Sequence, residues 1–67
     1  MKNSIRIDRI KLGIEMVKQD ISQKELAELT GVSRATINYI RSGKSCSREV
    51  ADKIAAALKV KLENIIE

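Results

Sequence analysis

The sequence is set apart first by the residue types that it lacks. Its 67 residues contain no proline, no histidine, no phenylalanine and no tryptophan, with only one tyrosine and three glycines. Few turn-forming residues favour helices over a turn-rich β fold. Without histidine, and with carboxylates scattered along the chain, no nucleophile is paired with a base and no metal-ligand cluster can be assembled. We therefore expect no enzyme, no metal or cofactor, and no small-molecule ligand.

The sequence also predicts no internal disulfide and no membrane span. The single Cys46 cannot form an internal disulfide, and no apolar run reaches the ~18 residues of a membrane span. No secretory signal is visible at the amino end. These features predict a cytoplasmic protein without a membrane partner. The length has room for one domain, residues 1–67, in which residues 1–7 form either a flexible or strand-like arm or, from Ser4, the start of the first helix.

The residues that are present describe a small aliphatic core and a basic surface. Hydrophobic residues make up 43% of the chain, and nearly all of them are aliphatic, which suits a small helical bundle. The formal net charge is +4, and no acidic residue occurs from Leu29 to Arg48, where four basic residues stand. Such a patch is the electrostatic footprint of phosphate binding, although a merely solvated basic loop would look the same.

The first predicted helix has two apolar faces. It begins either at Ser4 or after an Asp8 cap and ends near Lys18. One face is a narrow stripe at spacings of three and four, and the opposite face holds Ile5, Leu12 and Met16. The sequence does not decide which face points inward. Two apolar faces are more than a monomer of this size needs, which suggests a second contact, such as self-association. The narrow stripe comprises Ile7, Ile10, Ile14, Val17 and Ile21.

The central stretch predicts two short helices joined by a tight turn. Ser22 and Glu25 have the spacing of a capping box, which starts a helix over about 23–30. Gly31 suits a corner that requires positive φ, and a second helix follows over about 33–42. Two such helices form a helix-turn-helix, whose second member can lie in the major groove of DNA.

The remaining chain predicts two further helices. Ser47 caps a helix over about 48–58, and a last short helix closes the base with apolar residues between Val60 and Ile66. The fold expected is therefore an all-α, compact bundle of five short helices. The core stripe predicted for the fourth helix comprises Val50, Ile54, Ala57 and Leu58, with Ala51 and Ala55 allowing close packing.

From about residue 8 to residue 67 the chain resembles the lambda-repressor and Cro-like helix-turn-helix DNA-binding proteins, the XRE-type transcriptional regulators. The resemblance implies sequence-specific binding of double-stranded DNA by a small regulator, a repressor, acting as a homodimer on a pseudo-palindromic site. The alternative is a protein-interaction module, of antitoxin or adaptor type, that uses an exposed apolar helix stripe. The matching motifs are Ser22-Gln23-Lys24-Glu25-Leu26-Ala27, Gly31-Val32-Ser33, Ile37-Asn38-Tyr39-Ile40-Arg41-Ser42-Gly43-Lys44 and Ile54-Ala55-Ala56-Ala57-Leu58-Lys59-Val60.

Four residues of the second helix of the motif are candidates for base readout. Arg34 can pair with the N7 and O6 atoms of guanine, or contact a phosphate instead. Ala35 can touch a thymine methyl or simply leave room. Asn38 can pair with adenine or remain a solvated residue. Tyr39 can stack along a sugar or reach a phosphate, or its ring can be half-buried over the small core.

Six further residues are candidates for phosphate contacts. Gln23 stands at the start of a helix, where the partial positive charge of the helix adds to its side-chain amide, although any helix can begin with a glutamine. Ser33 is also a sufficient cap without DNA. The other basic or hydroxyl-bearing candidates lie on or just after the second helix of the motif: Thr36, Arg41, Lys44 and Arg48.

The chain departs from the family pattern in three places. Several family members have an Arg late in helix 1 paired with a Glu late in helix 3, but here those places hold approximately Met16 and Arg41. Lys59 stands where a glycine often ends helix 4, and Lys61 where Ser or Asp often caps helix 5. The dimer contact is expected either at Leu62–Ile66 or at the spare stripe of helix 1.

Overall fold

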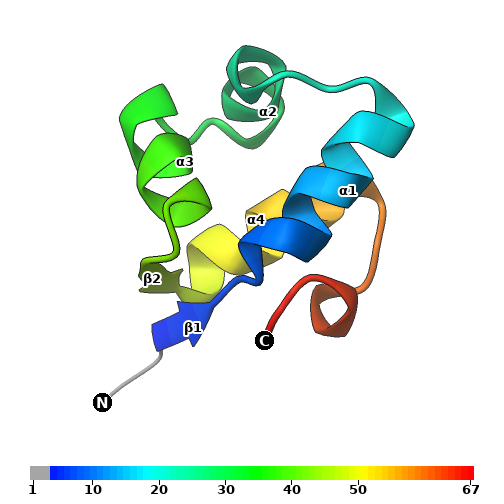
Figure 1. Cartoon of the computed structure of the whole chain (residues 1–67). Helices are drawn as coiled ribbons and strands as arrows, with labels where there is room; N and C mark the ends of the chain where they lie inside the picture. Colours follow the sequence, from blue (N-terminus) through cyan, green and yellow to red (C-terminus); the bar gives the residue numbers. More distant parts are fainter. Residues whose placement is uncertain (1–3) are drawn as a thin grey trace.

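A computed structural model of the chain describes residues 4–67, so the first three residues of the predicted arm lie outside the described part. Figure 1 shows four helices arranged around one core, with a short two-stranded sheet at one end. In chain order the elements are β1 (Ser4–Arg6), α1 (Arg9–Gln19), α2 (Gln23–Thr30), α3 (Arg34–Arg41), β2 (Ser45–Ser47), α4 (Arg48–Leu58) and a single 3₁₀ turn (Leu62–Asn64).

Side-chain caps determine where the helices begin. Asp8 caps α1 by accepting the backbone amides of Ile10 and Lys11 at 2.9 and 3.1 Å. Ser22 and Glu25 form the predicted capping box at the start of α2, with reciprocal bonds of 3.1 and 3.0 Å. The serines that precede α3 and α4 cap those helices in the same way. The predicted bounds of α2 and α4 are therefore confirmed.

The corner between α2 and α3 depends on two residues. Gly31 has φ of 73°, the left-handed conformation predicted for it, and its amide donates to the Ala27 carbonyl at 2.9 Å. The Thr30 hydroxyl donates to the Leu26 carbonyl at 2.7 Å and accepts the Val32 amide at 3.1 Å. Because these bonds satisfy the last carbonyls of α2 and the first amide of the turn, the corner is held without outside contacts.

The core is aliphatic and receives side chains from every helix. On α1 the inward face is that of Leu12 and Met16, whereas Ile10, Ile14 and Val17 remain exposed. The structure thus decides between the two faces of this helix. The buried hydrophobic residues are Ile7, Leu12, Met16, Leu26, Ala27, Ile37, Ile40, Ala51, Ile54, Ala55, Leu58 and Ile65.

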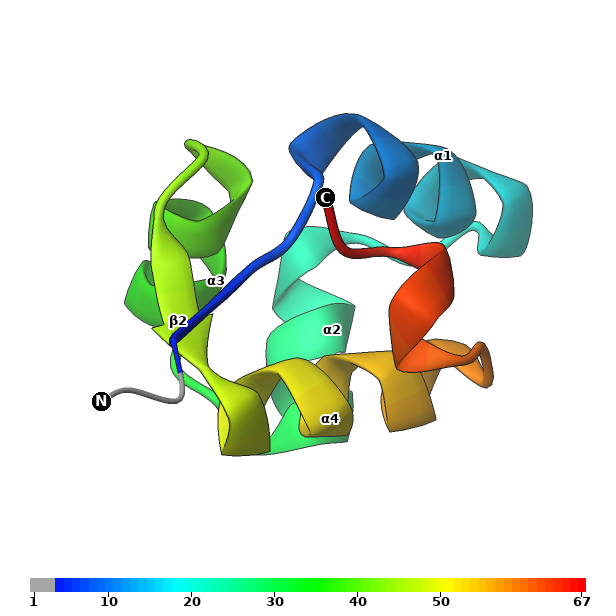
Figure 2. The same cartoon turned by 90° about the horizontal axis from the view of Figure 1, so that it is seen from below.

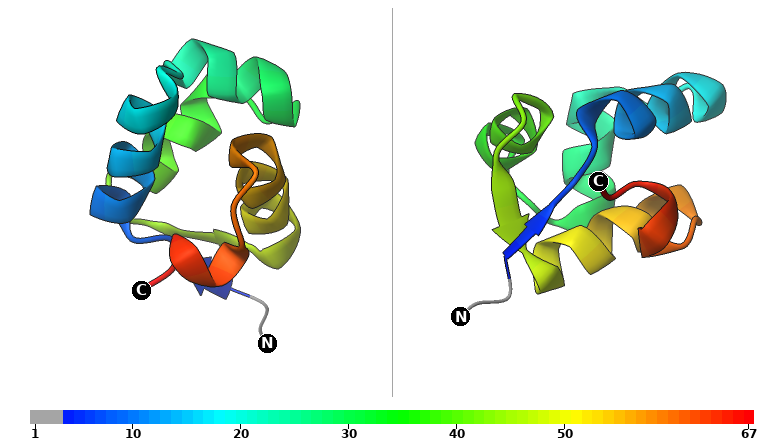
Figure 3. Two further views of the ribbon diagram at one scale, coloured as in Figure 1. Left: turned by 90° about the vertical axis from the view of Figure 1, so that its right-hand side faces the viewer. Right: turned by 60° about the horizontal axis from the view of Figure 1, so that its bottom comes forward.

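A sheet joins the arm to the connection between α3 and α4. β1 pairs antiparallel with β2, with Ile5 opposite Cys46, and both side chains are partly buried. The arm then meets the carboxyl end. Ile7 forms an isolated antiparallel β-bridge with Ile66, and the Asp8 amide donates to the Ile65 carbonyl at 2.8 Å. Figures 2 and 3 show the arm crossing beneath the helices beside the final segment.

The prediction of five helices was wrong. The described chain has four α-helices, and where the fifth was expected it makes only the 3₁₀ turn. Lys61 precedes this turn and provides no side-chain cap, so little favours a longer helix there. The last residues instead donate and accept backbone hydrogen bonds with the arm, and the Glu67 amide, which would bond within a helix, donates to the Arg6 carbonyl at 3.1 Å. The fold class remains mostly α.

Candidate nucleic-acid interface

The outer face of α3 carries all four residues predicted to read bases. Arg34, Ala35, Asn38 and Tyr39 are exposed, and Tyr39 keeps 55% of its surface accessible. Ile37 and Ile40, on the opposite face, are completely buried. Somewhat less than half of the tyrosine surface is therefore covered. The helix presents a continuous polar and aromatic strip that nothing in residues 4–67 covers, and Figure 1 shows α3 at the edge of the molecule.

The two hydroxyl-bearing candidates at the start of α3 are bonded to each other. Ser33 accepts the Thr36 amide at 3.1 Å and donates its hydroxyl to the Thr36 hydroxyl oxygen at 2.9 Å. Ser33 is therefore the cap of α3. Because either hydroxyl can rotate to donate, Ser33 and Thr36 both remain candidates for a phosphate contact.

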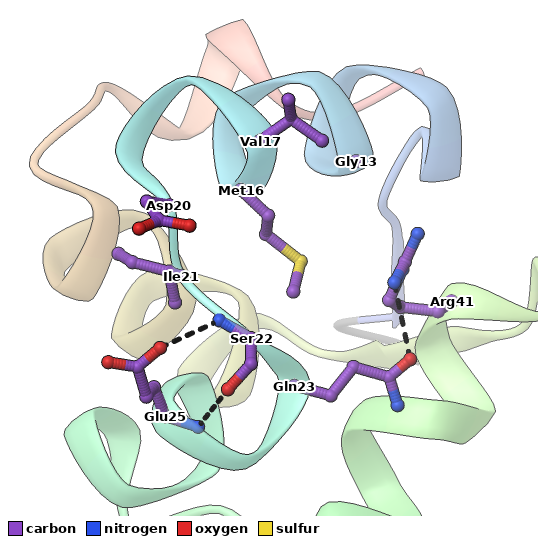
Figure 4. A pocket seen from close by; sticks show the side chains of 9 residues that line it. All are labelled: Gly13, Met16, Val17, Asp20, Ile21, Ser22, Gln23, Glu25 and Arg41. Atoms are coloured by element: carbon purple, nitrogen blue, oxygen red, sulfur yellow. Dashed lines mark hydrogen bonds between the residues drawn. The ribbon is translucent and has the colours of Figure 1, made fainter.

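Gln23 and Arg41 meet between the start of α2 and the end of α3. Arg41 Nη1 donates to Gln23 Oε1 at 3.2 Å. A guanidinium group can only donate hydrogen bonds, so this contact orients the glutamine with its oxygen toward Arg41 and its amide nitrogen away from it. Figure 4 shows the pair at one side of a pocket of about 340 Å³, with the Ser22–Glu25 capping box beside it.

Arg41 has no acidic partner within the described chain. The ion pairs of residues 4–67 join Arg6 to Glu67, Lys18 to Glu15, Arg48 to Asp52 and Lys53 to Glu49. The Nε atom of Arg41 is buried without a hydrogen-bond partner. Because Nε is buried, an added anion would have to bind the terminal nitrogens of the guanidinium. The positive charge of the guanidinium favours an anion there.

The loop after α3 adds an exposed lysine side chain. Gly43 has φ of 97°, and Lys44 beside it is exposed. Arg6 of β1 donates to the Gly43 carbonyl at 3.2 Å, which anchors the loop to the arm. Arg6 and its neighbour Arg9 line a depression with Gly43, and sequence analysis did not select either of them. Their basic character was the only available signal, because the contact between arm and loop is not local.

Arg48, another predicted phosphate contact, is paired with an acidic residue. Arg48 follows β2 and is paired with Asp52 at 3.8 Å, with 65% of its side chain exposed. It lines a depression with Ile5 and the carboxyl-terminal residues Lys61 and Leu62. The structure therefore brings Gln23 and Arg41 into contact, whereas Arg48 borders the depression near the carboxyl end.

Comparison with known proteins assigns the family. A family model described as helix-turn-helix (HTH_3), the Cro/C1-type or XRE class, matches residues 5–65. The chain belongs to the Cro/C1-type helix-turn-helix family. The match covers the capped α2, the Gly31 corner and α3, which together make up the helix-turn-helix.

Structural comparison agrees on the fold of this helix-turn-helix protein. A solved chain described as native PhpD with cadmium atoms superposes with a TM-score of 0.78 and 23% sequence identity. The alignment covers 91% of the present chain but only 13% of that chain, so the likeness concerns the fold of a small part of a longer protein. A comparison with curated proteins gave no match.

The longest helices of residues 4–67, α1 and α4, have 11 residues each. Within this part of the chain, none of the helices combines the length and the apolar character that a membrane span requires.

Proposed function

We propose that this Cro/C1-type protein is a sequence-specific regulator of transcription, a repressor, that inserts α3 into the major groove of double-stranded DNA in the cytoplasm. The observation that carries the proposal is the outward strip of α3. Arg34, Ala35, Asn38 and Tyr39 share one exposed face, while the other face fixes the helix to the core through Ile37 and Ile40.

The side chains on this strip have suitable chemistry for the edges of base pairs. The Arg34 guanidinium can donate two hydrogen bonds to guanine, and the Asn38 amide can pair with adenine in the same bidentate way. Ala35 lies between them and leaves space for a thymine methyl group. Tyr39 is long enough to reach the sugar-phosphate edge of the groove. Each bidentate contact would contribute about 1–3 kcal/mol of discrimination between bases.

Phosphate binding would position the strip. The Gln23 amide nitrogen is turned away from Arg41, at the amino end of α2, where the helix adds partial positive charge. Arg41 takes no part in the ion pairs of residues 4–67, and it borders the same pocket as Gln23. A phosphate in front of α2 would therefore meet the Arg41 guanidinium and an oriented amide, and the exposed Lys44 on the following loop would contact a further backbone phosphate. These residues support binding of the backbone on one side of the groove.

We also propose a homodimer on a pseudo-palindromic site, formed through the carboxyl-terminal surface. This surface contains the partly buried Ile5, Leu62 and Ile66, and its charged residues have both signs: Arg48 and Lys61 are basic and Glu63 is acidic. A two-fold contact places the same patch on both subunits, so a mixed patch can complement itself. The two α3 helices would then reach half-sites about 34–36 Å apart.

The test is a DNA-binding titration with matched variants. Fluorescence anisotropy of a mixed-sequence duplex at two salt concentrations measures how much phosphate contacts contribute to binding. The logarithm of the binding constant falls linearly with the logarithm of the salt concentration when counterions are released. Arg41→Ala removes a proposed phosphate contact, Arg34→Ala removes a proposed base contact, and Lys53→Ala on α4 removes one exposed positive charge elsewhere.

The proposal predicts different effects for the three variants. Arg41→Ala should weaken binding to all sequences and reduce the salt slope by about 1, whereas Lys53→Ala should change little. After selection of the preferred duplex, Arg34→Ala should lose about 1–3 kcal/mol of discrimination at one base pair. Absence of salt-dependent binding, or equal losses for Arg41→Ala and Lys53→Ala, would refute the DNA-binding surface proposed here.

A further inference from the structure

The exposed face of α1 carries an apolar stripe that neither the core nor the DNA-binding strip uses. Ile10, Ile14 and Val17 keep 64%, 54% and 81% of their surface exposed. They stand at positions i, i+4 and i+7, which places them on one side of the helix. The other large exposed hydrophobic residues, Leu29 and Tyr39, lie singly on α2 and α3. A contiguous stripe of this kind is typical of a binding surface.

Gly13 opens a groove along this stripe. The groove has a volume of about 480 Å³ and is bordered by Ile10, Ile14 and Val17 on α1 and by Arg41 of α3. A Cβ atom at Gly13 would stand 3.4 Å from Arg41 Nη2, so any larger side chain would fill the space between the helices. Glycine inside a helix costs roughly 0.5–1 kcal/mol relative to alanine, and here it leaves the groove open.

The rim of the groove is basic. Its charged members are Arg9, Lys18 and Arg41. Lys18 is partly neutralised by Glu15 at 3.5 Å, but neither arginine takes part in the ion pairs of residues 4–67. The groove therefore combines three aliphatic anchors with two uncompensated positive charges. DNA could neutralise the charges but would leave the aliphatic side chains uncovered.

A second copy of the chain fits this groove poorly. In an antiparallel contact of two α1 helices, Arg9 of one copy would approach Lys18 of the other, and in a parallel contact each would meet its own like charge. Anchors at i, i+4 and i+7 instead match the contact made by a single amphipathic helix.

We infer that the α1 groove is a docking site for an acidic amphipathic helix of a different protein. Aliphatic residues of that helix would cover Ile10, Ile14 and Val17, and its flanking carboxylates would pair with Arg9 and Arg41. Arg41 also borders the pocket that holds Gln23. A regulatory step follows, and it rests on the proposed DNA binding. Because a carboxylate of the docked helix and a phosphate of DNA would compete for Arg41, the docked helix weakens DNA binding and DNA weakens docking.

The probe for docking is a synthetic helical peptide of about 15 residues, with leucines repeating at i, i+4 and i+7 and glutamates on both sides of them. Its control has lysines in place of the glutamates. Binding is followed without DNA by the NMR signals of the Ile10, Ile14 and Val17 methyl groups. The protein variants are Val17→Ser, which removes an exposed anchor, and Leu29→Ser, which removes an exposed leucine outside the groove.

Docking predicts that the acidic peptide shifts these methyl signals and binds in the micromolar range. The lysine peptide and the Val17→Ser variant should each bind at least tenfold more weakly, while Leu29→Ser should bind like the unchanged protein. Failure of the acidic peptide to bind, shifts located elsewhere, or equal affinity for the lysine peptide would overturn the inference. Self-association that Val17→Ser abolishes would also overturn it, by giving the groove to a second copy.

The competition is tested separately, by adding the acidic peptide to the protein and duplex DNA. Affinity for DNA should fall as the peptide saturates α1, and Val17→Ser should remove the effect. If the peptide docks and DNA affinity stays constant, the regulatory step is wrong. A protein that binds the peptide but no DNA at all would refute the proposed function while leaving the docking site in place.

Discussion

At the scale of single residues, the chain contains a lysine in a backbone conformation that suits glycine. Lys59 follows α4 with φ of 60°, and its amide closes the helix by donating to the Ala56 carbonyl at 3.1 Å. A side chain with a Cβ atom is disfavoured in this left-handed region because it crowds the following carbonyl. The departure from the family pattern noted in the sequence is thus a small local strain.

Lys59→Gly should therefore stabilise the fold. We expect the free energy of unfolding to rise by about 0.5–1 kcal/mol, and the Tm by roughly 2–8 °C, in thermal and urea denaturation. Lys61→Gly is the matched control, because Lys61 has φ of −74° and gains nothing from glycine. A Tm that falls for both variants would show that the left-handed residue is not strained.

Cys46 lies in the middle of β2, and partial burial raises the pKa of its thiol. Only the thiolate reacts with iodoacetamide, so a raised pKa leaves less of the reactive form at neutral pH. Alkylation of the folded protein should be slower than that of the urea-unfolded chain, and its pH midpoint should be higher. Equal rates in the two states would contradict this, and Cys46→Ser serves as the unlabelled control.

At the scale of elements, α1 shows that apolar spacing alone does not identify a buried face. Ile7 and Ile10 belong to one periodic stripe in the sequence, yet Ile7 is completely buried and Ile10 is 64% exposed. Ile7 precedes the helix and faces the carboxyl-terminal segment, whereas Ile10 follows the Asp8 cap and points outward. The arm ends and α1 begins between these two residues, so the periodicity of one helix does not relate their side chains.

Replacing each isoleucine by alanine tests this assignment. Ile7→Ala should lower the free energy of unfolding by about 2–5 kcal/mol, because it leaves a cavity in a filled core. Ile10→Ala should change it by no more than about 0.5 kcal/mol, as for other surface positions. Urea titration of the two variants gives the comparison directly. Similar losses would mean that both faces of α1 are covered in solution.

Sequence patterns predicted the elements whose start signals are local. Ser22, Ser33 and Ser47 each cap a helix within three residues, so α2, α3 and α4 were found with nearly correct bounds. The β1–β2 pairing and the shortened last helix were missed because they depend on residues about forty or more positions apart. Likewise Gln23 and Arg41 were each selected as candidates, but their contact spans α2 and α3 and has no sequence signature.

At the scale of the whole molecule, charge is distributed unevenly among three surfaces. The surface around α3 and its loop is basic, the α1 groove is apolar with a basic rim, and the carboxyl-terminal surface has both signs. Each distribution matches a different partner in the proposals above: DNA, an acidic helix and a second copy. Net charge alone, at +4, would have suggested only the first.

Reversing one charge at the carboxyl-terminal surface should weaken the proposed homodimer. Glu63→Lys leaves only basic residues among the charged members of that surface, so the two copies would repel each other. Sedimentation equilibrium without DNA should show a dissociation constant at least tenfold higher than for the unchanged protein. Glu28→Lys on α2 makes the same charge change elsewhere and should have little effect. A monomer at high micromolar concentration in the unchanged protein would exclude the dimer.

The pairing of the arm with the carboxyl-terminal segment has a consequence for synthesis on the ribosome. Ile7 is among the first residues made, yet the surface that buries it includes Ile65 and Ile66, which are among the last of these 67 residues to be added. At about 5–20 residues per second, the arm waits several seconds for its partner. The capped helices can form earlier from local contacts, but the core closes only after residue 66 has left the exit tunnel.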